Sequence, residues 1–131
     1  SELLRKHDFD RHPADELAAY MVELHKKGVL HGDLNLTNIL YHTDQEGRYQ
    51  FTLIDTNRSK FKPAPTRQEC LENLKRLTHS KALLRYIVMQ YATLRGWNPR
   101  ECAFIVFRYL LNFEKKRKRK RKLQSWIGIK K

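Results

Sequence analysis

Two stretches decide the fold of this chain: HGDLNLTNIL at residues 31–40 and LIDTNR at residues 53–58. Asp33 is followed five residues later by Asn38, and Asp55 comes directly after the apolar start of the second stretch. Between them, apolar and β-branched residues flank a polar segment that contains a glycine, which predicts a short β-hairpin. Because a hairpin brings the ends of its strands together, we expect the three oxygen-bearing side chains to share one site.

These residue types suit phosphoryl transfer. That reaction needs a group that orients or deprotonates the acceptor hydroxyl, and divalent ions that neutralise the phosphate oxygens. Asp33 fits the first task. Mg²⁺ prefers hard oxygen ligands and binds through carboxylates together with substrate phosphates, which fits Asp55 and the amide oxygen of Asn38. We therefore predict Asp33 and Asn38 as catalytic residues, and Asn38 and Asp55 as the residues that hold the metal and the nucleotide.

The rest of the chain is expected to be mostly helical. Apolar residues recur at helical spacing over 13–27, where Pro13 suits the first position and Gly28 ends the helix. After the hairpin, two prolines predict an extended loop to residue 66. Three helices follow, over 67–78, over 80–94 and from the cap residue Asn98 onwards. The predicted fold class is therefore α+β, mostly α-helical.

The last helix has the clearest start signal. Asn98 is a good N-cap, Pro99 suits the first helical position, and Glu101 completes a capping pattern. Its core-facing side is expected to be aromatic and aliphatic, and these residues form it: Phe104, Phe107, Tyr109, Leu110 and Leu111.

The order His-x-Asp-x-x-x-x-Asn, hairpin and second aspartate resembles the catalytic and metal loops of the protein-kinase superfamily. With Gly32 where those kinases have Arg, and Asp-Thr-Asn-Arg at 55–58 where they have Asp-Phe-Gly, the chain is most similar to a smaller branch. That branch is the bacterial lipopolysaccharide core kinases, which phosphorylate Kdo or heptose sugars. A leucine-rich helix at 69–77, without a long activation segment before it, extends the resemblance over residues 13–77.

The resemblance implies a protein-kinase-like C-terminal lobe at residues 1–113, in which the short hairpin carries the catalytic and metal loops. It also implies ATP and Mg²⁺ as cofactors and a lipid-linked sugar as the acceptor. The sequence holds no glycine-rich phosphate loop, strand lysine or helix glutamate, so we expect the N-lobe to be absent and this chain alone to be inactive. Residues 114–131 are expected to form a basic C-terminal tail.

Three residues near the predicted site have open or secondary roles. Asn35 and Arg58 are predicted to bind the substrate. Asn35 stands where many protein kinases have Lys and many small-molecule kinases have His, which weakens the group that steadies the transferred phosphate. Arg58 either anchors a substrate phosphate or pairs with a carboxylate of the loop. We expect His31 to be structural, buried at the base of the loop and hydrogen-bonded to backbone near Asp55.

The charge of the chain is concentrated near its C-terminal end. Lys and Arg number 27 against 14 Asp and Glu, and eight of the basic residues are consecutive, at Lys115–Lys122. Eight adjacent like charges cannot all pair internally, so the run is either a solvated tail or a polyanion-binding segment. An anionic membrane surface is the expected partner, with Trp126 and Ile127 inserting at the interface. Nucleic acid is the alternative.

The remaining features point to a reducing compartment. Cys70 and Cys102 lie far apart and suggest neither a disulfide nor a zinc site. No apolar run approaches the roughly 20 residues of a membrane span. We therefore expect a cytoplasmic protein, peripheral at the inner face of the inner membrane.

Three functions follow from these observations. The first is an ATP-dependent phosphotransferase acting on a lipopolysaccharide core sugar. The second is an atypical protein kinase of the RIO-like type, whose basic tail binds nucleic acid or ribosomal particles. The third is a non-catalytic half-kinase that acts as a binding or scaffold module, whose exposed lobe face pairs with another copy of the chain or with another protein.

Overall fold

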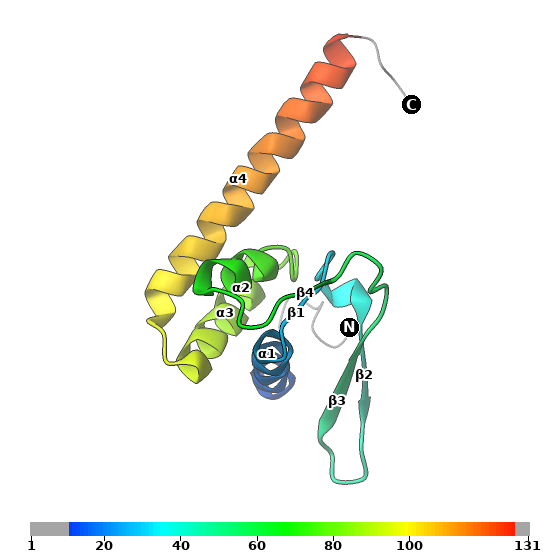
Figure 1. Ribbon diagram of the computed structural model, residues 1–131, viewed down its shortest axis with the longest axis vertical. Helices are drawn as coiled ribbons and strands as arrows, with labels where there is room; N and C mark the ends of the chain where they lie inside the picture. The colour runs from blue at the N-terminus through cyan, green and yellow to red at the C-terminus, as the bar shows by residue number, and fades with distance from the viewer. Residues whose placement is uncertain (1–10, 128–131) are drawn as a thin grey trace.

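The computed structural model describes residues 11–127, and its helices outweigh two small antiparallel sheets (Figure 1). The predicted α+β, mostly helical class is therefore confirmed. The elements, in chain order, are α1 (Arg11–Lys26), β1 (Val29–Leu30), η2 (Leu36–Asn38), β2 (Ile39–Thr43), β3 (Tyr49–Leu53), β4 (Lys60–Phe61), α2 (Arg67–Leu74), α3 (Lys81–Arg95) and α4 (Pro99–Trp126).

The core lies between the helices. α1 packs against α3, and α4 packs against both α3 and α2. The predicted apolar faces of the first three helices are buried, and the fully enclosed residues include Leu17, Met21, Leu71, Leu74, Leu83, Leu84, Ile87, Val88 and Tyr91. Cys70 and Cys102 are both buried and free.

The predicted hairpin is present as β2 and β3. Its strands pair antiparallel from Ile39 opposite Leu53 to Thr43 opposite Tyr49. Asp44 shapes the turn, because its carboxylate accepts the backbone N–H groups of Glu46 and Arg48, each at 2.9 Å. These bonds to the ionised form lower the pKa of Asp44. Only Ile39 among the residues of β2 is buried, so the hairpin leaves the core as it extends.

Two boundaries differ from the predictions. α1 already includes Arg11, so Pro13 is not its first residue. Proline is tolerated in the first turn of a helix because the N–H groups there have no helical partner. The helix predicted over 67–78 ends at Leu74, and a turn bonds the Leu77 N–H to the Leu74 carbonyl. Leu77 is still fully buried, because the chain turns inward there and the Leu77 carbonyl accepts the Leu36 N–H.

The core face of α4 was predicted correctly only in part: Phe107 and Leu110 are partly buried against the core, but Phe104 and Leu111 are not. The residues that α4 buries are Cys102, Ala103 and Val106, whereas the Phe104 and Leu111 side chains are 64% and 51% exposed. At about 100° per residue, Phe104 points to the side of the helix opposite Cys102. The fully buried residues of α4 are therefore small, and the bulky Phe104 faces outward.

α4 runs unbroken from Pro99 to Trp126 and so includes the whole basic run (Figure 1). Its first half packs on the body, while the second half, orange to red, extends past the other helices. Every residue from Glu114 to Ile127 is exposed. Among the helices that the structure describes, none is both long and apolar enough to cross a membrane.

Candidate functional site

The loop from His31 to Asn38 is fixed by a buried imidazole. His31 is 3% exposed, its Nδ1 accepts the Asp33 N–H at 2.9 Å, and its Nε2 donates to the Ile54 carbonyl at 2.9 Å. The first bond requires Nδ1 to be unprotonated, so the ring is neutral and protonated at Nε2. The predicted structural role of His31 is confirmed, and its ring ties the start of the loop to the end of β3.

Asp33 and Asn38 are brought together. The Asn38 side chain is 8% exposed, and its Nδ2 donates to the Asp33 backbone carbonyl at 2.8 Å. Asn35 lies between them, donating from Nδ2 to Asp33 Oδ1 at 3.1 Å. Asn35 Oδ1 also caps the η2 turn by accepting the N–H and hydroxyl of Thr37. The Asp33 carboxylate stays 42% exposed, so it is held from one side and open to solvent on the other.

Asp55 reaches the same region through the backbone. The Ile54 N–H donates to the Asn38 carbonyl at 2.9 Å, which places Asp55 one residue from both the hairpin base and the His31 contact. Asp55 is exposed and has a positive φ of 55°. Aspartate is among the few non-glycine residues that adopt this conformation. Within residues 11–127, no hydrogen bond or ion pair engages its carboxylate, so that carboxylate is open to a ligand.

The donor set fits a cation that shares its coordination with phosphates. Asn38 uses its nitrogen on Asp33, which leaves Oδ1 without a hydrogen-bond donor from the described residues. Asp55 offers an open carboxylate one residue after Ile54, whose N–H bonds the Asn38 carbonyl. No group of three or more His, Cys, Asp or Glu side chains within residues 11–127 could hold a metal ion by itself. One carboxylate and one amide suit Mg²⁺ bound together with nucleotide phosphates rather than in an all-protein cage.

Gly32 lets two segments of the site approach closely. A Cβ placed on Gly32 would lie 2.4 Å from the Arg58 Cβ and 2.5 Å from the Arg58 carbonyl oxygen. Arg58 itself is exposed and has no ion-pair partner among the described residues. It lines a hollow of about 490 Å³ together with His31, Asp33 and Lys60. Of its two predicted roles, pairing with a loop carboxylate is absent from the described part of the chain.

Arg76 is a site residue that the sequence analysis missed. Its Nη1 lies 3.4 Å from Asp33 Oδ1, and its guanidinium carbon lies 4.6 Å from the centre of the Phe113 ring. Arg76 follows the end of α2, and Phe113 comes from α4. The sequence holds no local signal for this contact, because three segments far apart in the chain meet only in the folded structure.

Asn73 is the second missed residue, and it supports the loop from below. Its Nδ2 donates to the His31 carbonyl at 2.8 Å, and its Oδ1 accepts from His25 Nε2 at 2.9 Å. Tyr91 then donates its hydroxyl to His25 Nδ1 at 2.6 Å. Asn73 is partly buried and lies next to the buried Leu74 of α2, and an amide beside a core leucine was the available signal.

Burial keeps His25 neutral. The side chain is 1% exposed, and desolvation lowers its pKa below the usual value of 6.5; the Asn73 hydrogen bond opposes this and the Arg95 charge adds to it. Burial also raises the pKa of Tyr91, which is consistent with its role as donor. Neutral, fully paired side chains therefore connect α1, α2 and α3 to the loop that carries Asp33.

The family of the chain follows from comparison with known proteins. Neither the curated proteins nor the solved structures gave a match. A protein-family model does match, that of the lipopolysaccharide kinase (Kdo/WaaP) family, over residues 5–109. This match covers most of the chain and includes the loop, the hairpin, α2 and α3. The chain therefore belongs to the lipopolysaccharide kinase (Kdo/WaaP) family.

Proposed function

We propose that this chain supplies the catalytic loop of an ATP-dependent kinase whose acceptor is a hydroxyl of a lipopolysaccharide core sugar. Family membership supports a phosphotransferase. The observation that supports the proposal is that the Asn38 side chain bonds the Asp33 carbonyl, while the backbone next to Asp55, the Ile54 N–H, bonds the Asn38 carbonyl at the base of the hairpin. In overall form the chain would be the C-terminal lobe of a protein-kinase-like fold.

Asp33 acts on the acceptor in this proposal. Its carboxylate accepts the hydroxyl proton as the acceptor oxygen forms a bond to the γ-phosphorus of ATP, and the bond to the β–γ bridging oxygen breaks to release ADP. Asn35 and Arg76 hold the carboxylate from the protein side, so its open side faces the acceptor. Asn35 would orient Asp33, and because it is uncharged it would not neutralise charge on the phosphate.

Asn38 and Asp55 would hold Mg²⁺, which neutralises charge on the nucleotide phosphates when bound. Asn38 is fixed by its bond to Asp33, so its free oxygen has a defined position. Asp55 adds one negative charge and the Asn38 amide adds none, so the pair repels the phosphates less than two carboxylates would. Arg58, at the rim of the hollow that Asp33 lines, would contact a substrate phosphate.

The test is phosphoryl transfer from radiolabelled ATP to Kdo-containing lipid A, with and without Mg²⁺, using the full-length protein. Asp33→Asn and Asp55→Asn should each reduce the rate by about 10²-fold or more, as loss of an acid–base or metal group does. Glu46→Gln is the control, since Glu46 is an exposed carboxylate of the same hairpin that pairs with Arg48. Full activity in both Asp variants would refute the assigned roles. Transfer to protein acceptors instead would favour the RIO-like alternative.

The basic half of α4 favours a membrane-bound acceptor. Its eight consecutive Lys and Arg residues, Lys115–Lys122, are all exposed and lead to Trp126, which is 85% exposed. A segment of this composition is attracted to anionic lipid headgroups by about 1 kcal/mol per basic residue. The chain would then work at the inner face of the inner membrane.

Self-association through an exposed lobe face stays a prediction. Large apolar side chains near the site are exposed, with Leu40 at 53% and Phe61 at 75%. A dimer would cover such residues. Sedimentation at increasing concentration tests this. The apparent molecular mass of the parent protein should rise with concentration, and that of Phe61→Ser should stay lower.

A further inference from the structure

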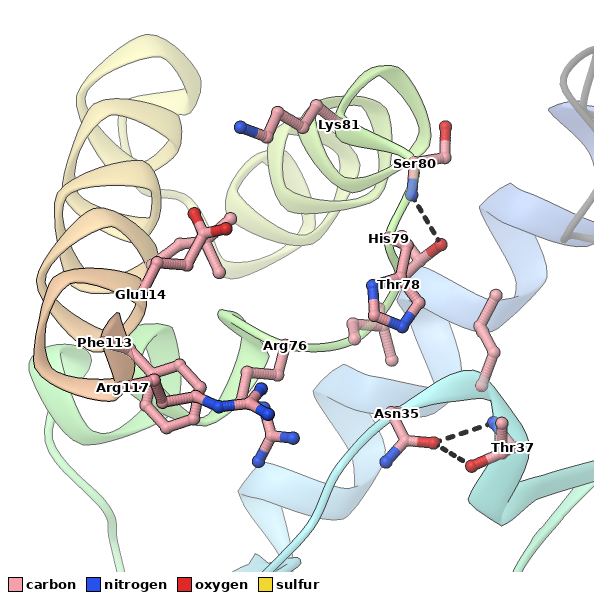
Figure 2. Close-up of a pocket in the computed structure, with 13 residues that line it drawn as sticks. Asn35, Thr37, Arg76, Thr78, His79, Ser80, Lys81, Phe113, Glu114 and Arg117 are labelled. Atoms are coloured by element: carbon pink, nitrogen blue, oxygen red, sulfur yellow. Dashed lines mark hydrogen bonds between the residues drawn. The ribbon is translucent and has the colours of Figure 1, made fainter. Parts of the chain in front are cut away.

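A second cavity lies beside the loop, on the side toward α4. Its volume is about 530 Å³, and its lining comes from the loop, from the α2–α3 connection and from α4. Figure 2 shows two distinct ends: Lys81 and Glu114 lie at one, while Arg76 and Arg117 lie at the other, toward Asn35. Asn35 is the residue that donates to Asp33, so this second end borders the proposed catalytic carboxylate.

Three cations approach the ring of Phe113, and two of them, Arg76 and Arg117, line this cavity. The Phe113 centroid lies 4.6 Å from the Arg76 guanidinium, 5.7 Å from that of Arg117 and 5.5 Å from Lys75 Nζ. Lys75 and Arg76 come from the end of α2 and Arg117 from α4, so the ring is approached from two elements. Aromatic stacking holds guanidinium groups in place but does not neutralise them.

The positive charge there is only partly balanced. In the described part of the chain, Arg76 is paired with Asp33 at 3.4 Å and Lys75 with Glu72 at 3.8 Å, whereas Arg117 has no carboxylate partner. Like charges held close together repel one another, so this arrangement gains from an added anion. A guanidinium has five N–H donors, so Arg76 can hold Asp33 and an anion together.

We propose that the cluster of Arg76, Phe113 and Arg117 binds a phosphate or carboxylate carried by the acceptor, and so positions its hydroxyl at Asp33. The inference rests on the proposed function and adds where the acceptor is recognised. Two arginines provide the paired, planar donors that these anions accept. Arg117 also belongs to the basic run, so the first turn of that run is part of the site.

The inference is tested by binding alone, without ATP, in calorimetric titrations of the full-length protein. The probes are glucose 6-phosphate, glucuronate and glucose, which separate a phosphate source, a carboxylate source and the uncharged ring. We expect one or both anionic probes to bind and glucose not to bind. Arg117→Gln should weaken binding about tenfold or more, as loss of a charge-assisted contact does, and Arg117→Lys should restore it in part.

The matched control is Arg108→Gln. Arg108 is also an α4 arginine stacked on a phenylalanine, at 5.9 Å from the Phe104 centroid, but it lies outside the cavity lining. Its variant should bind the probes as the parent does. Arg119→Gln removes a charge from the basic run without touching the cavity lining. If it weakens binding as much as Arg117→Gln, the attraction is diffuse and the inference is overturned, as it is if glucose binds equally well.

Failure of this inference can be told apart from failure of the proposed function. Anion binding that depends on Arg117, in a protein that transfers no phosphate, leaves the cluster in place and removes the kinase role. Conversely, if phosphoryl transfer depends on Asp33 but Arg117→Gln leaves the KM for the charged acceptor unchanged, the kinase stands and the cluster is not its acceptor site.

Discussion

Gly32 is the residue where the site is most tightly packed. Its φ is not in the left-handed region, so it is not needed for turn geometry, but the Arg58 carbonyl lies within 2.5 Å of where a Cβ would be. Gly47 shows the opposite case, with a φ of +79° and no neighbour within 4 Å of its Cβ position. The two glycines therefore serve different purposes, close approach and backbone conformation.

Substitutions separate these purposes. Gly32→Ala should lower the free energy of unfolding by about 1–3 kcal/mol, because the backbone of Arg58 must move. Gly47→Asn should change it little, since asparagine tolerates a positive φ and the space is open. Urea unfolding of both variants measures this difference. A Gly32→Ala protein as stable as the parent would mean that the loop does not lie against Arg58.

At the scale of the elements, the helix boundaries that depend on capping residues were predicted from the sequence. Ser80 and Gly96 bound α3, and Asn98, Pro99 and Glu101 begin α4, because caps are satisfied within a few residues. The pairing of β1 with β4 was missed. Two-residue strands have no periodicity, and Val29 meets Phe61 only because the chain folds back on itself.

The candidate site also combines residues that local spacing indicates with contacts that only the folded chain creates. Asp33, Asn38 and Asp55 could be selected from the sequence, since their spacing around the hairpin is itself the signal. The contacts of Asp33 with Arg76, and of His31 with Asn73, join residues about 40 positions apart, and no spacing rule encodes them. The extension of α4 through the basic run was also not predicted, because like charges at helical spacing oppose a helix.

The chain of side chains from Arg95 through Tyr91, His25 and Asn73 couples three helices to the loop. It predicts a pH dependence of stability. The pKa of His25 is lowered below 6.5 in the folded state, so the unfolded chain binds the proton more readily. Above pH 6.5 neither state is protonated there and the stability is complete. As the pH falls below 6.5, protonation favours the unfolded chain and stability is lost.

The pH dependence can be assigned to one histidine. Urea midpoints measured between pH 8 and pH 5 should fall with decreasing pH, and His25→Gln should flatten the part of that slope below about pH 6.5. His42→Gln serves as the control, because His42 is exposed on β2 and should leave the slope as it is. Equal slopes in the parent and in His25→Gln would show that His25 is not held neutral by the fold.

At the scale of the whole molecule, charge and packing are separated along α4. The half that packs on α2 and α3 is largely apolar, whereas the projecting half carries the basic run and ends at Leu123, Trp126 and Ile127 (Figure 1). These three lie on one side of the last turns, and their side chains are 58%, 85% and 48% exposed. The basic residues surround the helix on all sides. If the end of α4 meets a membrane surface, the basic run and the exposed apolar side chains can therefore both contact it.

We therefore expect binding to vesicles that contain phosphatidylglycerol and little binding to phosphatidylcholine alone. Binding should weaken as salt is raised, because screening lengths fall to about 8 Å at physiological ionic strength. In a Trp97→Phe background, Trp126 fluorescence should shift to shorter wavelength as the indole enters the interface. Trp126→Ala should bind more weakly, and Phe104→Ala, which removes an exposed α4 aromatic from the packed half, should not. A helix end that inserts apolar side chains gains free energy from lipid that a phosphate backbone cannot supply, so double-stranded DNA of equal charge concentration should not displace the protein from the vesicles. If the DNA does displace it, the basic half is a nucleic-acid-binding segment and the membrane assignment is wrong.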